Sequence, residues 1–142
     1  MVKDSIINFN VSTKGGEKQA DELFHDYRRK LRKLRTEPEA KSVKKIDAMI
    51  VELNEAAQQF EQLGSTSLAA QYLALMGRGQ FMRGKVEQMW ETIGKALSLD
   101  PNCEFALLHL GEFHANTARR IDDADRAKEE WERSARYMRI CR

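Results

Sequence analysis

Apolar residues recur along the chain at the spacing of amphipathic helices. Between Glu17 and Arg35 they are separated by three, four and seven positions; these residues are Ala20, Leu23, Phe24, Tyr27, Leu31 and Leu34. A second stretch keeps a strict three-four alternation through Val43, Ile46, Ile50, Leu53, Ala57 and Phe60. Such spacing puts apolar side chains on one face of a helix. The sequence therefore predicts an antiparallel helical hairpin over residues 17–64.

The expected ends of these helices come from local signals. Thr36 and Glu39 have the spacing of a capping box, which predicts that the second helix starts there, and the Gly64-Ser65-Thr66 segment predicts its end. An intermolecular coiled coil is the alternative for the second stretch. Its apolar seam is shorter than the three or four heptads that coiled coils normally sustain, so a long capping helix is favoured. Residues 1–16 are expected to be extended or disordered, since Gly15-Gly16 interrupts any pattern before residue 17.

Residues 70–137 contain one pattern twice, 34 positions apart. An apolar run ends at Gly77, Gly84 predicts a turn, and Pro101 ends the next helix because proline lacks the N–H that a helix interior needs. Pro101 also suits the first turn of the following helix. Thirty-four positions on, Leu73, Met76 and Gly77 align with Leu107, Leu110 and Gly111. A helical glycine costs roughly 1 kcal/mol relative to alanine, so a closely approaching partner helix is expected at Gly77 and Gly111, and the small Ala96 fits the same need.

This period, with small residues where two helices touch, resembles the tetratricopeptide repeat family. The resemblance covers about half of the chain and implies helical hairpins at residues 70–103 and 104–137. The second copy departs from the family, because matching Ala127 and Trp131 to its small and bulky positions needs about four extra residues, which we expect in a longer turn within Thr117–Asp123. Two copies are fewer than the three that usually bury a continuous core. We therefore expect a single all-α domain of about six helices, with two repeat-like hairpins packed on the N-terminal hairpin.

A weaker resemblance concerns Leu110-Gly-Glu-Phe113 and the segments that precede it. Together with the stretch that ends at Gly64 and the one that ends at Pro101, it is similar to the first part of the tetratricopeptide proteins that read nascent tubulin at the ribosome. Most of the matched residues are shared by tetratricopeptide repeats in general. The resemblance therefore implies the fold but not the specific function.

Composition excludes few classes of protein. The chain has 142 residues, of which 42% are hydrophobic and 32% charged, as in an ordinary globular domain. No apolar stretch approaches the roughly 18 residues that a membrane span needs, and the N-terminus lacks the pattern of a signal peptide. Cys103 and Cys141 have no framework of further cysteines, which favours a reducing compartment. We expect the cytoplasm, with the nucleus as the alternative.

Positive charge is concentrated at the end of the first predicted helix. Residues 1–36 contain nine Lys or Arg against five Asp or Glu, although the whole chain has a net charge of only +2. The cluster consists of Arg28, Arg29, Lys30, Arg32, Lys33 and Arg35. One interpretation is a solvated helix end that complements the helix dipole. The other is contact with an anionic partner, namely RNA phosphates, as in RNA or a ribosome, an acidic peptide tail or a nuclear import receptor.

No pattern in the sequence supports catalysis, a metal or a cofactor. His109 and His114 are five residues apart, unlike the i, i+4 pair of a helical zinc site, so we expect structural or surface roles for them. No serine or cysteine lies in a nucleophile elbow. The glycines around Gly77 lack the spacing of a phosphate-binding loop. We therefore expect no enzymatic activity and assign no catalytic, metal or cofactor residue.

The family resemblance implies a concave groove lined by the first helix of each repeat. Carried over residue by residue, the groove positions are Gln71, Ala74, Arg78, Phe81, Phe105, Leu108, Glu112 and Ala115. This groove is expected to be apolar with one Arg and one Glu, which suits a peptide or an amphipathic helix. The alternative is that Phe81, Phe105 and Leu108 are buried by the chain's own next element.

The expected function is that of a non-enzymatic adaptor that binds a protein or a peptide in this groove. The alternative is an RNA- or ribosome-associated factor that uses the basic helix Arg28 to Arg35. The last predicted helix carries Trp131, Tyr137 and Ile140 without a polar helix after them. Repeat arrays usually cover their last apolar face with such a capping helix, so self-association or partner docking is expected there.

Overall fold

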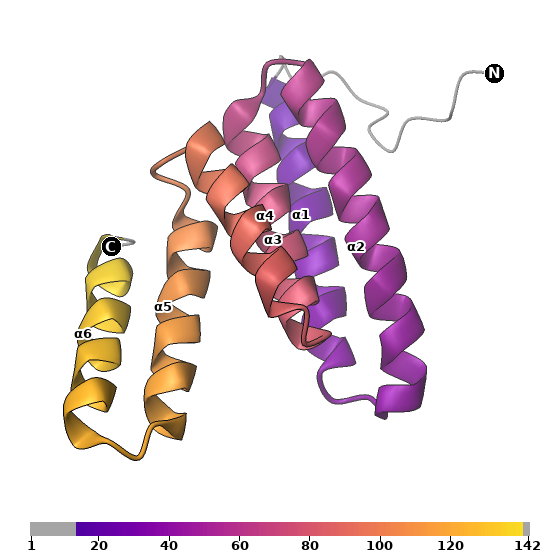
Figure 1. Ribbon diagram of the computed structural model, residues 1–142. Coiled ribbons are helices and arrows are strands. Elements are labelled where there is room, and N and C mark those ends of the chain that lie inside the picture. Colours follow the sequence, from indigo (N-terminus) through magenta and orange to yellow (C-terminus); the bar gives the residue numbers. More distant parts are fainter. Residues whose placement is uncertain (1–13, 141–142) are drawn as a thin grey trace.

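The computed structural model describes residues 14–140, which form helices joined by short turns (Figure 1). The helices are α1 (Lys14–Leu34), α2 (Glu39–Gln62), α3 (Thr66–Met82), α4 (Val86–Leu99), α5 (Glu104–Arg120) and α6 (Ala124–Ile140). No strand occurs within this part of the chain. The predicted all-α fold of about six helices is therefore confirmed. Residues 1–13 of the segment that was expected to be extended or disordered lie outside the described residues.

Glycine ends two of the helices, as predicted. Gly64 and Gly84 have positive φ angles of 79° and 74°, a region that glycine enters without steric cost. After each glycine the next N–H returns to a carbonyl of the helix: that of Ser65 donates to Phe60 and that of Lys85 to Gln80, both at 2.9 Å. These bonds form Schellman motifs that satisfy the last carbonyls.

The prediction of a capping box at Thr36 and Glu39 is wrong. The Thr36 hydroxyl donates to the carbonyl of Lys33 at 2.9 Å, at the end of α1. Pro38 occupies the position before α2, with an extended conformation and no side-chain capping bond. The physical reason is that a proline pushes the preceding residue out of the helical region, so α2 cannot start before Pro38. At the other end of α1, the helix starts at Lys14 and includes Gly15-Gly16 instead of beginning after it.

The expected long turn in the second hairpin is also wrong. Residues 121–123 connect α5 to α6, and residues 83–85 connect α3 to α4, so the two connections have the same length. Both α3 and α5 have 17 residues, but in the 34-residue alignment α5 begins and ends four residues later than α3, so the extra residues are helical at the end of α5. Pro101 lies in the turn between α4 and α5 and not in a helix, because α5 begins at Glu104. Continuing a helix keeps its carbonyls bonded, which a longer turn would not.

The core is built around α3, which is packed between α2 and α4. A Cβ atom at Gly77 would lie 2.8 Å from Cδ1 of Ile93 on α4, and one at Gly79 would lie 3.1 Å from Cγ1 of Ile50 on α2. The predicted close approach at Gly77 is thus confirmed. The apolar face of α2 packs against α3 of the same chain, and Phe60 on this face is fully buried. The helix therefore packs as the predicted capping helix would.

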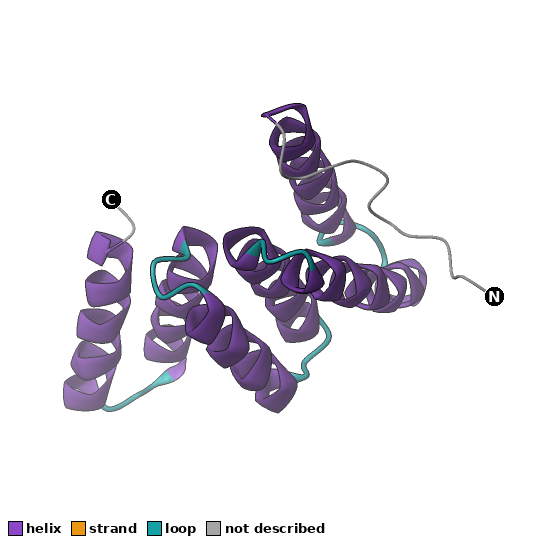
Figure 2. Cartoon of the chain, turned by 90° about the horizontal axis from the view of Figure 1, so that it is seen from above, coloured by secondary structure: helices purple, strands orange, loops and turns teal. Residues whose placement is uncertain are grey.

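The first helix is attached differently. Figure 2 shows α1 standing out from the row that the other helices form. Its main anchor is Tyr72 on α3, whose hydroxyl donates to the carbonyl of Ala20 at 2.8 Å and whose ring lies 5.7 Å from that of Phe24. Burial raises the pKa of Tyr72, consistent with a phenol that stays protonated as a donor. This attachment places α1 along the edge of α3 and near the start of α5.

Candidate functional site

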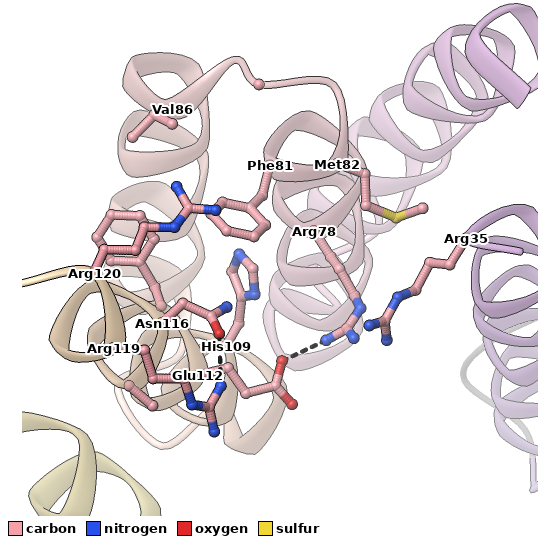
Figure 3. Close-up of a pocket in the computed structure, with 13 residues that line it drawn as sticks. Arg35, Arg78, Phe81, Met82, Val86, His109, Glu112, Asn116, Arg119 and Arg120 are labelled. Atoms are coloured by element: carbon pink, nitrogen blue, oxygen red, sulfur yellow. Dashed lines mark hydrogen bonds and ion pairs between the residues drawn. The ribbon is translucent and has the colours of Figure 1, made fainter. Parts of the chain in front are cut away.

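A groove runs between α1, α3 and α5 and consists of two connected lobes. The outer lobe has a volume of about 610 Å³ and lies near the C-terminal ends of α3 and α5. The inner lobe has a volume of about 190 Å³ and lies against α1. Four residues line both lobes, namely Arg35, Arg78, His109 and Glu112. We refer to the two lobes together as the groove; Figure 3 shows the residues that line the outer lobe.

The groove brings together most residues of the two sites expected from the sequence. From the predicted peptide site, its lining includes Ala74, Arg78, Phe81, Phe105, Leu108, Glu112 and Ala115. Gln71 is half-buried and does not line it. From the predicted anionic site, the lining includes Arg28, Arg32 and Arg35. The peptide site and the basic helix are therefore parts of one groove.

The basic cluster of α1 is divided between two faces of the helix. Arg28, Arg32 and Arg35 are separated by four and three positions and so share one face, which borders the groove. The other three cations do not line it: Arg29 pairs with Asp26, Lys30 lies 5.7 Å from the ring of Tyr27, and Lys33 is exposed. Helical geometry thus selects three of the six cations for the site.

The floor of the groove contains an ion pair between the two repeat copies. Nη1 of Arg78 on α3 lies 2.7 Å from Oε2 of Glu112 on α5, and the two residues occupy equivalent positions 34 apart. Both side chains are about one-third exposed, so the pair adds only about 0–1 kcal/mol to stability. Its effect on the site is electrostatic, because it neutralises Arg78.

Aromatic side chains line the groove and also contact the protein's own core. Phe105 lies 4.6 Å from Phe24 on α1, with the guanidinium of Arg28 5.2 Å from its centroid. Phe81 lies 5.8 Å from His109 and 5.7 Å from Phe113. Both phenylalanines are half-buried and packed against the core. The interpretation that these phenylalanines line a groove and the alternative that the chain buries them are therefore each correct in part.

Phe105→Ala should reduce stability and loosen α1. Truncating a fully buried phenylalanine costs about 3–5 kcal/mol, and we expect about 2 kcal/mol for this half-buried ring. The contact with Phe24 is lost and Arg28 loses its cation–π partner. Urea denaturation would measure the loss, and hydrogen exchange would show faster exchange in the second half of α1. Unchanged stability and exchange would mean that Phe105 does not hold α1.

The groove is more cationic than the sequence predicted. Six arginines line it: Arg28, Arg32, Arg35, Arg78, Arg119 and Arg120. Glu112 is the carboxylate among the lining residues of both lobes. Sequence reasoning missed Arg119 and Arg120, because it expected a turn where α5 continues. The available signal was their spacing of seven and eight residues from Glu112, which places them on the same face once the helix is extended.

His109 lines both lobes as a buried neutral base. It is 5% exposed, and neither ring nitrogen has a hydrogen-bond partner in the described part of the chain. Burial, and then the nearby Arg78, lowers the pKa of His109 to about 4, although Glu112 acts in the opposite direction. His114 has a separate role, with Nδ1 2.6 Å from Oε2 of Glu130 on α6. The sequence did not indicate that His109 lines a groove.

Outside the groove, the last helix carries an exposed aromatic residue. Trp131 on α6 is 44% exposed, and the guanidinium of Arg119 lies 5.5 Å from its ring. The side chains of Tyr137 and Ile140, which were expected to take part in self-association, lie outside the described residues. None of the helices described is both long and apolar enough to cross a membrane. Self-association through α6 remains an expectation.

Comparisons with models of protein families, with curated protein sequences and with solved structures give no significant match. The tetratricopeptide resemblance therefore rests on the residue pattern of residues 70–137. The evidence for a function is therefore the distances, burial and charge of the side chains around the groove.

Proposed function

We propose that this chain is a non-enzymatic adaptor that binds a peptide or a helix of a partner protein in the groove between α1, α3 and α5. The observation that carries the proposal is that residues from three helices, expected to form two separate sites, line one groove. Separate clusters on a solvated surface would have no reason to converge.

The dimensions and chemistry of the groove fit a peptide. Ligand sites typically have volumes of about 300–1,000 Å³ and combine apolar walls with a few polar groups; the outer lobe has about 610 Å³. Phe81, Phe105 and Leu108 provide apolar surface, and the arginines provide donors at the rim. Recognition of an extended peptide or an amphipathic helix uses this combination.

RNA or ribosome binding through the basic helix is the second candidate, favoured by the three arginines of α1. Two observations make it the weaker one. The isoelectric point is about 8.6, below the value above about 9 that is typical of nucleic-acid-binding domains. The rings of the groove are packed against the protein's own side chains, whereas binding of single strands needs open rings on which bases stack.

Blocking the groove should abolish peptide binding without unfolding the protein. We expect a library of displayed random peptides to give binders to the purified chain, and Leu108→Trp to abolish their binding, because the larger ring fills part of the inner lobe. Leu108 is half-buried, so the stability change should be within about 1 kcal/mol. Fluorescence anisotropy with the selected peptides measures the binding.

Val51→Trp is the matched control. Val51 on α2 is 58% exposed and does not line either lobe, so the same bulky substitution there should leave binding unchanged. The proposal fails if no peptide is selected, or if the selected peptides bind the Leu108→Trp variant as tightly as the wild type.

A further inference from the structure

We infer that the segment held in the groove is acidic, with carboxylates on both sides of an apolar side chain. The inference rests on the proposed function and goes beyond it by naming the chemistry of the partner. It starts from the charge of the groove, which the structure concentrates from helices far apart in the sequence.

The arginines of the groove are mostly without a carboxylate partner. Within residues 14–140, Arg78 is the lining arginine that forms an ion pair, with Glu112. Arg32, Arg35 and Arg120 have no carboxylate within ion-pair distance in this part of the chain. Figure 3 shows Arg35 pointing from α1 toward Arg78. Like charges gathered in a concave surface produce a positive potential that attracts anions. An anionic ligand would relieve this repulsion.

The distribution of the arginines suggests where the carboxylates bind. Arg28 and Arg32 line only the inner lobe, Arg119 and Arg120 line only the outer lobe, and Arg35 and Arg78 line both. Arginine binds carboxylates through paired, charge-assisted hydrogen bonds. The half-buried rings are divided in the same way, since Phe105 lines the inner lobe and Phe81 the outer lobe. A peptide that spans both lobes therefore meets arginines and an apolar ring in each lobe.

His109 provides a second, independent indication of a ligand. It is buried and lines both lobes, and among the residues that the structure describes neither ring nitrogen has a hydrogen-bond partner. Buried polar groups in native proteins are nearly always paired, so a missing partner points to a group supplied from outside. The N–H of the neutral ring is able to donate to a carboxylate or a backbone carbonyl of the peptide.

The test uses two triple variants of one helix that change the net charge equally. The groove triple neutralises the three cations that border the groove and consists of Arg28→Gln, Arg32→Gln and Arg35→Gln. The other triple neutralises the three cations on the remaining face and consists of Arg29→Gln, Lys30→Gln and Lys33→Gln. The probe is a short fluorescein-labelled peptide in which glutamate pairs alternate with single leucines, and its glutamine counterpart is the neutral comparison. We expect the groove triple to weaken binding of the acidic peptide on the order of tenfold to a hundredfold, and the other triple to change it by less than about twofold.

Arg28 also contacts Phe105, so the double variant Arg32→Gln and Arg35→Gln is included in case the triple is destabilised. The inference is overturned if both triples weaken binding equally, or if the glutamine peptide binds as tightly as the glutamate peptide. It is also overturned if an oligouridylate of similar length binds more tightly and loses affinity in the groove triple, which would identify an RNA site. If neutral peptides bind and Leu108→Trp prevents their binding, the proposed function is supported and only the inference of an acidic ligand is contradicted. Absence of all peptide binding would remove both.

Discussion

Gly77→Leu should destabilise the protein by about 3 kcal/mol or more, out of a total that is typically about 5–15 kcal/mol. The glycine lies where α3 crosses α4, and even a Cβ atom there would lie 2.8 Å from Cδ1 of Ile93 and 3.1 Å from its Cγ1. Ile93 is 1% exposed, so its side chain has little room to move away. The three further carbons of leucine then force the two helices apart. Urea denaturation followed by circular dichroism measures the effect.

Gly94→Leu is the matched control, because it makes the same substitution next to Ile93 on α4. A Cβ atom at Gly94 meets nothing within 4 Å and the residue is exposed, so this variant should be stabilised by roughly 0.5–1 kcal/mol through helix propensity. The double variant Gly77→Leu and Ile93→Ala should recover part of the lost stability, since the alanine creates space for the leucine. Equal losses at both glycines would show that the crossing is not the cause.

The second large effect is a loss of stability in mild acid that His109 controls. Its folded-state pKa of about 4 lies below the ordinary value of about 6.5 for the unfolded chain. Below about pH 6.5 the unfolded state therefore binds a proton that the folded state does not. The part of the folding stability that depends on a neutral His109 is therefore fully present above about pH 6.5, and it is lost as the pH falls toward 4. The difference of about 2.5 pKa units corresponds to about 3 kcal/mol.

His109→Leu isolates this contribution, because leucine is of similar size and does not titrate. Carboxylates also titrate near pH 4, so the difference between the two free energies of unfolding is the informative quantity. It should be constant above about pH 6.5 and should shift in favour of the variant by about 3 kcal/mol toward pH 4. At neutral pH the variant should be at least as stable as the wild type, since an unpaired buried group costs about 1–3 kcal/mol. Parallel curves for the two proteins would contradict the assignment.

A neutral-pH gain in His109→Leu would also bear on function. A buried imidazole without a partner lowers stability, so its presence needs a compensating role. If the same variant binds acidic peptides more weakly, that role is recognition in the groove. If binding is unchanged, His109 is only a destabilising core residue, and the missing hydrogen bonds say nothing about a ligand.

The candidate site could be predicted in part. The tetratricopeptide resemblance implied that Arg78 and Glu112 line one groove, and the structure joins them in an ion pair. Arg119 and Arg120 were missed, because whether four extra residues extend a turn or a helix is not visible in the hydrophobic pattern. The choice was made by backbone hydrogen bonding along α5, which a longer turn would have left incomplete.

What the sequence by itself determined is local: the periodicity of apolar residues specifies the helices, and Gly64 and Gly84 specify where two of them end, because these signals act within one or two helical turns. Only the tertiary structure decided which way α1 faces. The contacts of Phe24 and Ala20 with Tyr72 orient this helix so that Arg28, Arg32 and Arg35 border the groove while Lys33 faces away from it. That orientation depends on packing between residues about 50 positions apart, for which local spacing carries no information. The charge of the groove is therefore a property of the fold, although every arginine in it is visible in the sequence.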